Sequence, residues 1–180
     1  MSNKQDLISS IEELNIVPVA VSYQWEPCDL FKTKELYMSR GGVKYVKQKD
    51  EDLISILTGI MQQKGMVHFN LCKPLEKEEY IPFASEAPNK FYLHVAQLID
   101  ERIHKNYRLW NTNYIAHDLR SETHKYKTHY SPDEKEEFLK RLHYIFSQIE
   151  GDTEIIKDIF LGIYANPVAK ADPKTPVKMA

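Results

Sequence analysis

Apolar positions change their spacing along the chain, which predicts both strands and helices in the first half and only helices in the second. In residues 16–25, apolar side chains occupy both alternating sets, which predicts a strand covered on both faces. One set is Val17, Val19, Val21 and Tyr23, and the other is Ile16, Pro18, Ala20 and Ser22. Proline has no N–H to donate to a ladder, so we expect Pro18 at an edge, a bulge or the opening of its strand. In residues 66–75, Val67, Phe69 and Leu71 alternate with His68 and Asn70 and predict a second, half-buried strand.

Apolar residues three and four positions apart predict helices over residues 5–14, 29–40, 50–64, 89–104, 113–120, 132–150 and 152–164. In the third of these we expect a buried stripe of Leu53, Ile56, Leu57, Ile60 and Met61. Together these elements predict an α/β fold, in which a small sheet flanked by helices occupies residues 1–88. An all-helical module follows over residues 89–166, and the Pro- and Lys-bearing residues 167–180 are expected to be disordered.

Composition narrows the classes of partner and compartment. The 180 residues carry a net charge of -2, which gives no electrostatic reason for nucleic acid as the main partner. No apolar run approaches the roughly 20 residues that span a bilayer, and the N-terminus lacks the features of a signal peptide. Cys28 and Cys72 have no metal-like spacing and are interpreted as free thiols. We therefore expect a cytoplasmic chain without a metal or cofactor, with peripheral contact at the inner membrane left open.

Two segments of the first half resemble a known family. IVPVAVSY, residues 16–23, is similar to the fourth conserved motif of the glycerophosphate and lysophosphatidate acyltransferases. GMVHFNLCKPL, residues 65–75, resembles the strand that follows that motif, although Cys72 stands where the family commonly has glycine. NYRLWNTNYIAHDL and IYANPV extend the similarity to a bacterial subgroup with a helical C-terminal extension, over residues 14–168. The resemblance implies a partial glycerolipid acyltransferase fold in residues 1–88.

The resemblance also implies an activity whose catalytic motif this sequence lacks. The family transfers an acyl chain from acyl-CoA or acyl carrier protein to a glycerol hydroxyl, with the histidine of a His-x4-Asp motif as general base. No histidine here is followed by aspartate at the fifth position, and the family's phosphate-gripping Glu-Gly-Thr-Arg motif is absent. We therefore expect the chain to correspond to the C-terminal half of such an enzyme, with no catalytic residue of its own. A sheet divided in this way would have an exposed strand edge.

The resemblance places Val17, Pro18 and Val19 in the wall of the acyl pocket. Lys34 and Arg40 belong to a basic cluster that could meet the phosphate of a lipid or of CoA, or could simply form a solvated helix face. The other members of this cluster are Lys32, Lys44, Lys47 and Lys49. His117 and Asp118 are adjacent, and adjacent residues on a helix point about 100° apart, so we expect a surface or structural role for this pair and not a catalytic one.

The predicted function is therefore part of a glycerolipid acyltransferase, which supplies acyl-pocket wall and scaffold. Its partners would be acyl-CoA or acyl carrier protein and a glycerophospholipid precursor, bound through the full-length enzyme. The alternative is a non-catalytic lipid- or partner-binding protein derived from the same fold, and a third interpretation is a domain-swapped regulatory subunit. The sequence leaves open whether the chain is itself an enzyme.

Overall fold

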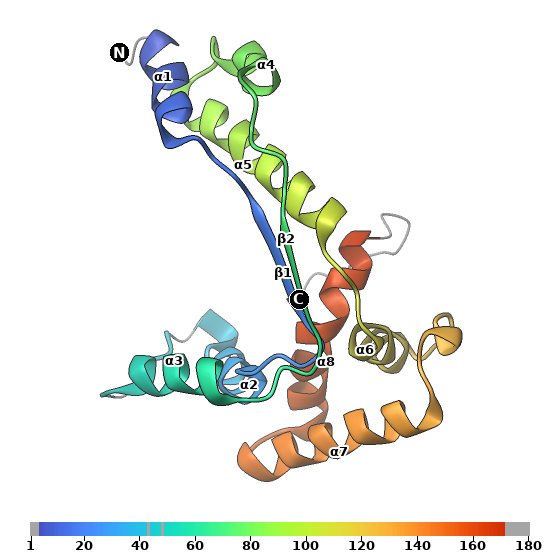
Figure 1. The fold of residues 1–180 in the computed structure, drawn as a ribbon. Helices are drawn as coiled ribbons and strands as arrows, with labels where there is room; N and C mark the ends of the chain where they lie inside the picture. The colour runs from blue at the N-terminus through green and yellow to red at the C-terminus, as the bar shows by residue number, and fades with distance from the viewer. Residues whose placement is uncertain (1–3, 43, 48, 172–180) are drawn as a thin grey trace. The chain divides into compact units, whose positions relative to one another are not determined.

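The fold is mostly helical, with one small two-stranded antiparallel sheet. A computed structural model describes residues 4–42, 44–47 and 49–171 (Figure 1). The strands are β1 (Val19–Tyr23) and β2 (Val67–Leu71). The helices in these ranges are α1 (Lys4–Leu14), α2 (Asp29–Met38), α3 (Glu51–Met61), α4 (Lys77–Tyr80), α5 (Pro88–Asn106), α6 (Asn111–Ser121), α7 (Pro132–Gln148) and α8 (Thr153–Ala171). Short 3-10 turns occupy Arg40–Gly42, Ile81–Phe83 and Lys127–His129.

The chain forms two compact units, and each is built from two separate stretches of sequence. The first comprises residues 1–22 and 68–108, and the second comprises residues 23–67 and 109–180. This division differs from the boundary predicted at residue 88, where the apolar period changes. A change of period marks a change of secondary structure, whereas membership of a compact unit depends on which core each helix joins.

The first unit has its core between α1, α4 and α5, which lie close to one another in Figure 1. Leu7 and Ile11 of α1 pack there with Phe91 and Val95 of α5. The ring of Tyr80 meets the ring of Phe91 edge-on at 6.3 Å between centroids, a favourable aromatic geometry. The helix predicted over residues 5–14 therefore buries Leu7 and Ile11, whereas Leu14 at its end is 67% exposed.

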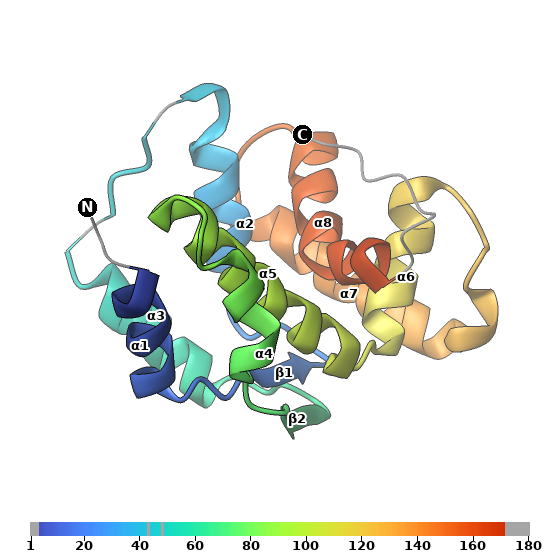
Figure 2. The ribbon, with the colours of Figure 1, turned by 90° about the horizontal axis from the view of Figure 1, so that it is seen from above.

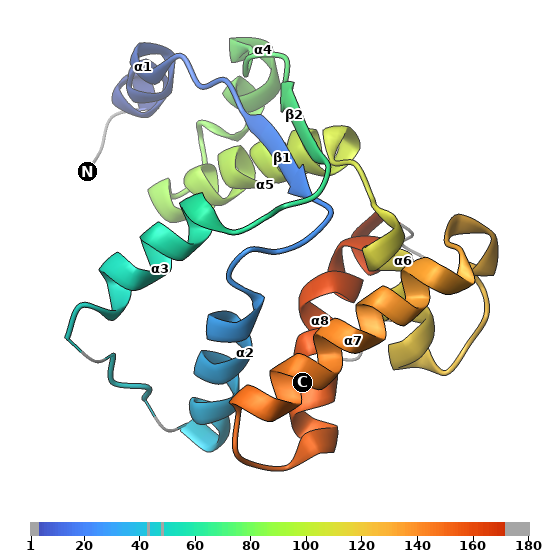
Figure 3. The same cartoon turned by 60° about the horizontal axis from the view of Figure 1, so that its bottom comes forward.

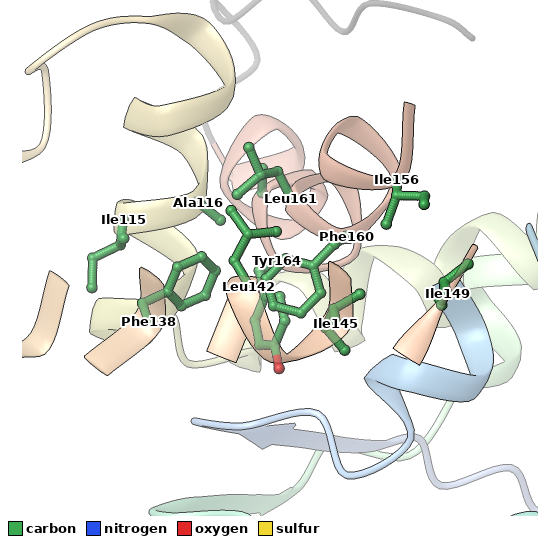
Figure 4. Packing of buried hydrophobic residues seen from close by; sticks show 11 residues of the cluster. Ile115, Ala116, Phe138, Leu142, Ile145, Ile149, Ile156, Phe160, Leu161 and Tyr164 are labelled. Atoms are coloured by element: carbon green, nitrogen blue, oxygen red, sulfur yellow. The ribbon is translucent and has the colours of Figure 1, made fainter. Parts of the chain in front are cut away.

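The second unit has a larger core between α6, α7 and α8, which are grouped together in Figure 2. Phe138 of α7 packs against Phe160 and Tyr164 of α8, and these side chains point toward one another in Figure 4. Trp25 stacks on Phe138 at 5.9 Å, which joins the segment after β1 to this core. Helix α2 lies beside α8 (Figure 3).

Helix α7 begins where the sequence predicts. Ser131 caps it by accepting a hydrogen bond from the backbone N–H of Glu134, whose carboxylate accepts in turn from the N–H of Ser131. Pro132 occupies the first turn, where its missing N–H leaves no bond unmade.

Helix α8 continues past its predicted end. It includes Pro167 and reaches Ala171, so residues 167–171 are helical rather than disordered. Ala165 and Val168 are buried against the core, and their burial holds the last turns despite the proline. Residues 172–180 of the predicted disordered tail lie outside the described residues.

The two strands pair in an antiparallel register. The carbonyl of Pro18 accepts a bond from the N–H of Cys72 at 2.9 Å, and the N–H of Gln24 donates to the carbonyl of Met66 at 2.9 Å. Pro18 immediately precedes the first residue of β1, so of the three positions predicted for it (an edge, a bulge or the opening of its strand) it takes the opening.

Helix α3 contradicts the prediction of a buried stripe. None of its residues is buried, and Leu53, Ile56, Leu57, Ile60 and Met61 are at least half exposed. The helical spacing was identified correctly, but the apolar side of the helix does not face the core of its unit. Periodicity reports which residues share a face of a helix, and it does not report which face is covered.

We predict that Gly65→Ala destabilises the second unit by about 2–3 kcal/mol. Gly65 has a φ of +62°, a left-handed conformation that costs an L-residue roughly 1–2 kcal/mol. A methyl group there would also lie 2.4 Å from Oε1 of Gln24 and 3.0 Å from the ring of Trp25. Gly42→Ala is the matched control, because Gly42 has a φ of +80° with open space around it. Urea unfolding followed by the fluorescence of Trp25 and Trp110 measures both, and equal losses would contradict the prediction.

Candidate functional site

One face of the first unit's strands is apolar and exposed. The register places Val19 opposite Leu71 and Val21 opposite Phe69, so these four side chains share one side of the sheet. Val19 is 36% exposed, Phe69 64% and Leu71 66%. We call this surface the ribbon face, and it consists of Val17, Val19, Val21, Phe69 and Leu71.

The opposite side of β2 is bonded to the C-terminal end of α5. His68 Nε2 donates to the backbone carbonyl of Asn106 at 2.9 Å, and Asn70 Nδ2 donates to Oδ1 of Asn106 at 3.2 Å. Asn106 Nδ2 in turn donates to the carbonyl of Arg102 at 2.8 Å. The last carbonyls of a helix have no partner within the helix, so the bond from His68 satisfies one of them, that of Asn106.

This attachment explains why β2 is oriented against its pattern. In a half-buried strand the apolar set normally faces the core, which is what the sequence predicts for Phe69 and Leu71. Here the polar set faces α5, and a strand that directs one set inward must direct the other outward. The prediction that β1 is covered on both faces is wrong for the same reason, because Val17 and Val19 lie on the exposed side.

Both edges of the ribbon are open in the part of the chain that the structure describes. There, β1 and β2 form a two-stranded sheet and pair only with each other. In this register the peptide groups of Val19 and Val21 point away from β2, and those of Phe69 and Leu71 point away from β1. Open edges beside an apolar face are unusual in a finished sheet, because each invites another strand.

The predicted substrate-binding residues divide between the two units. Val17 and Val19 belong to the ribbon face, whereas Pro18 is buried on the opposite side, where it can shape the backbone but cannot line the face. Lys34 and Arg40 are exposed residues of the second unit. The guanidinium of Arg40 lies 4.1 Å from the centre of the Tyr37 ring, and its Nε donates to the carbonyl of Tyr37.

Two members of the predicted basic cluster are engaged with acids. Lys32 pairs with Glu26 at 3.0 Å, and Lys47 pairs with Asp52 at 2.7 Å. These pairs neutralise part of the positive charge that the sequence pattern indicates.

Sequence reasoning did not identify the buried carboxylate of the second unit. Asp29, at the start of α2, is 1% exposed and accepts bonds from Nε and Nη2 of Arg141 and from the hydroxyl of Tyr164. The Asp29 bond raises the pKa of Arg141, and burial together with the Asp29 charge raises the pKa of Tyr164 well above its usual value. No local pattern marks these residues, because they are more than 100 positions apart in sequence.

A cavity of about 200 Å³ opens beside this carboxylate. Trp25, Glu26, Gln62 and Glu137 line it together with the Asp29–Arg141 pair. Glu26 is already bonded to Lys32 and to the backbone N–H of Cys28, and Asp29 is bonded to Arg141 and Tyr164. The bonds of Asp29 hold α2 to α7 and α8.

His117 and Asp118 have structural roles, as the sequence predicts. Asp118 is buried and accepts bonds from the hydroxyls of Thr123 and Tyr130 and from the N–H of Tyr126. His117 Nδ1 lies 3.9 Å from Oδ1 of Asp118, longer than a hydrogen bond. Asp118 therefore anchors the loop between α6 and α7.

Comparison of the chain with profiles of known protein families, with curated proteins and with solved structures yields no significant match. Within the described residues, no helix combines the length and apolarity needed to cross a bilayer. Nor do those residues bring together three histidine, cysteine or acidic side chains in a way that could hold a metal ion.

We predict that Asp29→Ala lowers the stability of the second unit by about 3 kcal/mol, because it leaves the Arg141 charge and the Tyr164 hydroxyl without their acceptor. Asp158→Ala is the matched control. Asp158 makes an equivalent two-point contact with Arg120, but it is exposed, so the expected loss is at most about 1 kcal/mol. Urea unfolding monitored by tryptophan fluorescence distinguishes the two, and a loss for Asp29→Ala no larger than the control would refute the assignment.

We predict that the folded chain loses stability at alkaline pH because of Tyr130. Burial and the bond to Asp118 raise its pKa to about 12 in the folded chain, from 10 when unfolded. Its contribution is therefore complete below pH 10 and disappears as the pH rises through 12, because only the unfolded state releases the proton in between. Unfolding free energies at several pH values should fall less steeply between pH 10 and 12 in Tyr130→Phe than in the parent. Parallel curves would show that this hydroxyl contributes nothing.

Proposed function

We propose that the chain supplies one wall of a fatty-acyl binding slot in a glycerolipid acyltransferase. The ribbon face would contact the acyl chain, while the two units act as scaffold. The acyl donor would be acyl-CoA or acyl carrier protein, and the acceptor a glycerol-phosphate-type molecule.

The observation that carries this proposal is the exposure of the ribbon face. Phe69 and Leu71 are each about two-thirds exposed on a strand whose polar side chains are turned toward α5. Large contiguous apolar surfaces on a protein usually mark a place where a ligand, a membrane or another chain binds. An extended row of valine, phenylalanine and leucine side chains suits a hydrocarbon chain, since each buried methylene contributes about 0.8 kcal/mol.

The attachment of β2 to α5 supports a permanent binding surface. His68 and Asn70 would lose their bonds to Asn106 if the strand turned its apolar side inward. The carbonyl and side chain of Asn106 would then face apolar side chains without these partners, which would oppose such a rotation. The ribbon face is thus held outward whether or not anything covers it.

The sequence resemblance supports the identity of the ligand. The segment with Val17, Pro18 and Val19 resembles the family's pocket strand, and two of these three side chains lie on the ribbon face. Pro18 forgoes one ladder bond at the opening of β1, which fixes the backbone beside the face. Cys72, in place of the family's usual glycine, is buried with its Sγ 3.7 Å from the carbonyl of Arg102.

The chemical step would come from residues outside this sequence. The family's reaction uses a histidine to take the proton of the acceptor hydroxyl and an aspartate to orient that histidine. The sequence contains no His-x4-Asp motif. The open ribbon edges offer positions at which the strands of a catalytic half could extend the sheet.

We predict that the chain binds a fluorescent fatty-acyl probe and that Val19→Asp or Phe69→Asp weakens binding at least about tenfold, because a carboxylate would have to be desolvated against hydrocarbon. Leu93→Asp is the matched control, since Leu93 is a similarly exposed apolar residue on α5, outside the ribbon face. Fluorescence titration measures the affinities of the parent and of the three variants. Equal affinity of the parent and Phe69→Asp would overturn the assignment of the face.

An acyl-transfer assay tests whether the chain binds the acyl group without catalysing its transfer. The chain alone should not transfer acyl groups from acyl-CoA to glycerol 3-phosphate, and turnover at enzyme-like rates would contradict the proposal. A non-catalytic lipid-binding protein would show the same probe binding. It would differ in giving no activity when combined with a separately expressed domain that carries the His-x4-Asp motif.

A further inference from the structure

Helix α3 presents its large apolar side chains to solvent along one side. At 100° per residue, Leu53, Ile54, Ile56, Leu57, Ile60 and Met61 fall within an arc of about 160°. Their exposure ranges from 49% for Ile54 to 80% for Met61. The helix is therefore strongly amphipathic, and its apolar side is uncovered.

The small and polar side of α3 faces its own unit. The Sγ of Cys28 donates to the carbonyl of Ser55 at 3.5 Å. A Cβ at Gly59, one turn further along, would lie 3.6 Å from the same sulfur. Because these small residues permit the close approach, rotation of α3 to bury its isoleucines would force larger side chains against α2.

The charges at the ends of α3 suit a negatively charged surface. Lys44, Lys47 and Lys49 precede the helix, and the ammonium of Lys64 donates to the carbonyls of Ile60 and Gln62 at its end. Three acids also lie at its start: Asp50 is the exposed N-cap residue, Glu51 accepts a bond from the hydroxyl of Tyr45, and Asp52 pairs with Lys47. The four lysines outnumber these three acids, and the apolar arc itself carries no charge.

The dimensions of α3 favour a bilayer over a second copy of the chain. Eleven residues span only about 16 Å, which is too short to cross a membrane but sufficient to lie in its interface. A face about 16 Å long and 10 Å wide is far below the roughly 800 Å² per partner of a stable protein interface. A lipid surface has no such minimum and accepts the lysine side chains among its headgroups.

We propose that α3 docks the protein onto the surface of an anionic phospholipid bilayer. Ile56, Ile60 and their apolar neighbours enter the acyl region, while Lys44, Lys49 and Lys64 contact the headgroup phosphates. The proposal rests only on residues of the second unit, so it is independent of the ribbon face and of the acyl-slot assignment.

Vesicle flotation with the full chain tests this docking. The parent should float with phosphatidylcholine vesicles in which roughly a third of the lipid is phosphatidylglycerol, and bind pure phosphatidylcholine less. Ile56→Ser/Ile60→Ser should reduce binding at least about tenfold, since two buried side chains are lost. Lys44→Glu/Lys49→Glu should reduce binding to anionic vesicles by about fivefold or more per lysine. Leu36→Ser/Met38→Ser, which removes two exposed apolar residues from α2, is the matched control and should bind like the parent.

A fluorescent reporter in α3 locates the contact. Ile60→Trp should gain a blue-shifted emission with anionic vesicles and be quenched by lipids with brominated acyl chains, whereas Leu36→Trp should not. Phe69→Asp should float like the parent, which separates this docking from binding at the ribbon face. The proposal would be overturned if the parent did not float, or if Ile56→Ser/Ile60→Ser floated as well as the parent. It would also be overturned if the parent formed an oligomer that the double variant does not form and neither protein bound vesicles.

Discussion

The bonds from His68 and Asn70 to Asn106 determine what the strands of this protein expose. They satisfy the end of α5 and at the same time hold the polar side of β2 against the first unit. Because side chains alternate along a strand, this single choice directs Phe69 and Leu71 outward. The ribbon face, and with it the proposed acyl-binding wall, follows from the capping of one helix.

The second unit is organised around a buried charge in a comparable way. Asp29 joins α2 to α7 through Arg141 and to α8 through Tyr164. A buried carboxylate is tolerated only when its lone pairs are occupied, and here two side chains occupy them. The helix that precedes α3 in sequence is thereby attached to the core between α6, α7 and α8, whereas α3 has no buried residue of its own.

Both units thus contain an element whose apolar side faces away from its own core. In the first unit this element is the ribbon, and in the second it is α3. The two surfaces differ in form, and so do the occupants they suit. The ribbon face is lined by branched and aromatic side chains beside open peptide edges, which suits an extended chain or further strands. The apolar arc of α3 is convex and flanked by lysines, which suits a lipid interface.

The sequence by itself determined the positions of the main elements. The strand around Val19 and the capped start of α7 at Ser131 follow from local physics, namely alternation and capping. The missing proline N–H limits Pro18 to an edge, a bulge or the opening of its strand, and it lies at the opening. The grouping of Val17 and Val19 on one face follows from alternation as well.

Only the tertiary structure decided which faces are covered and which distant residues meet. Alternation identifies the two sides of β2 but cannot show that the polar side packs against the end of α5. The helical period of α3 likewise cannot show that Cys28 contacts the side with the small residues. The contact of Asp29 with Arg141 joins residues 112 positions apart, and no local pattern encodes such a pairing. Burial is a property of the assembled chain, since a side chain is buried only by neighbours that folding brings to it.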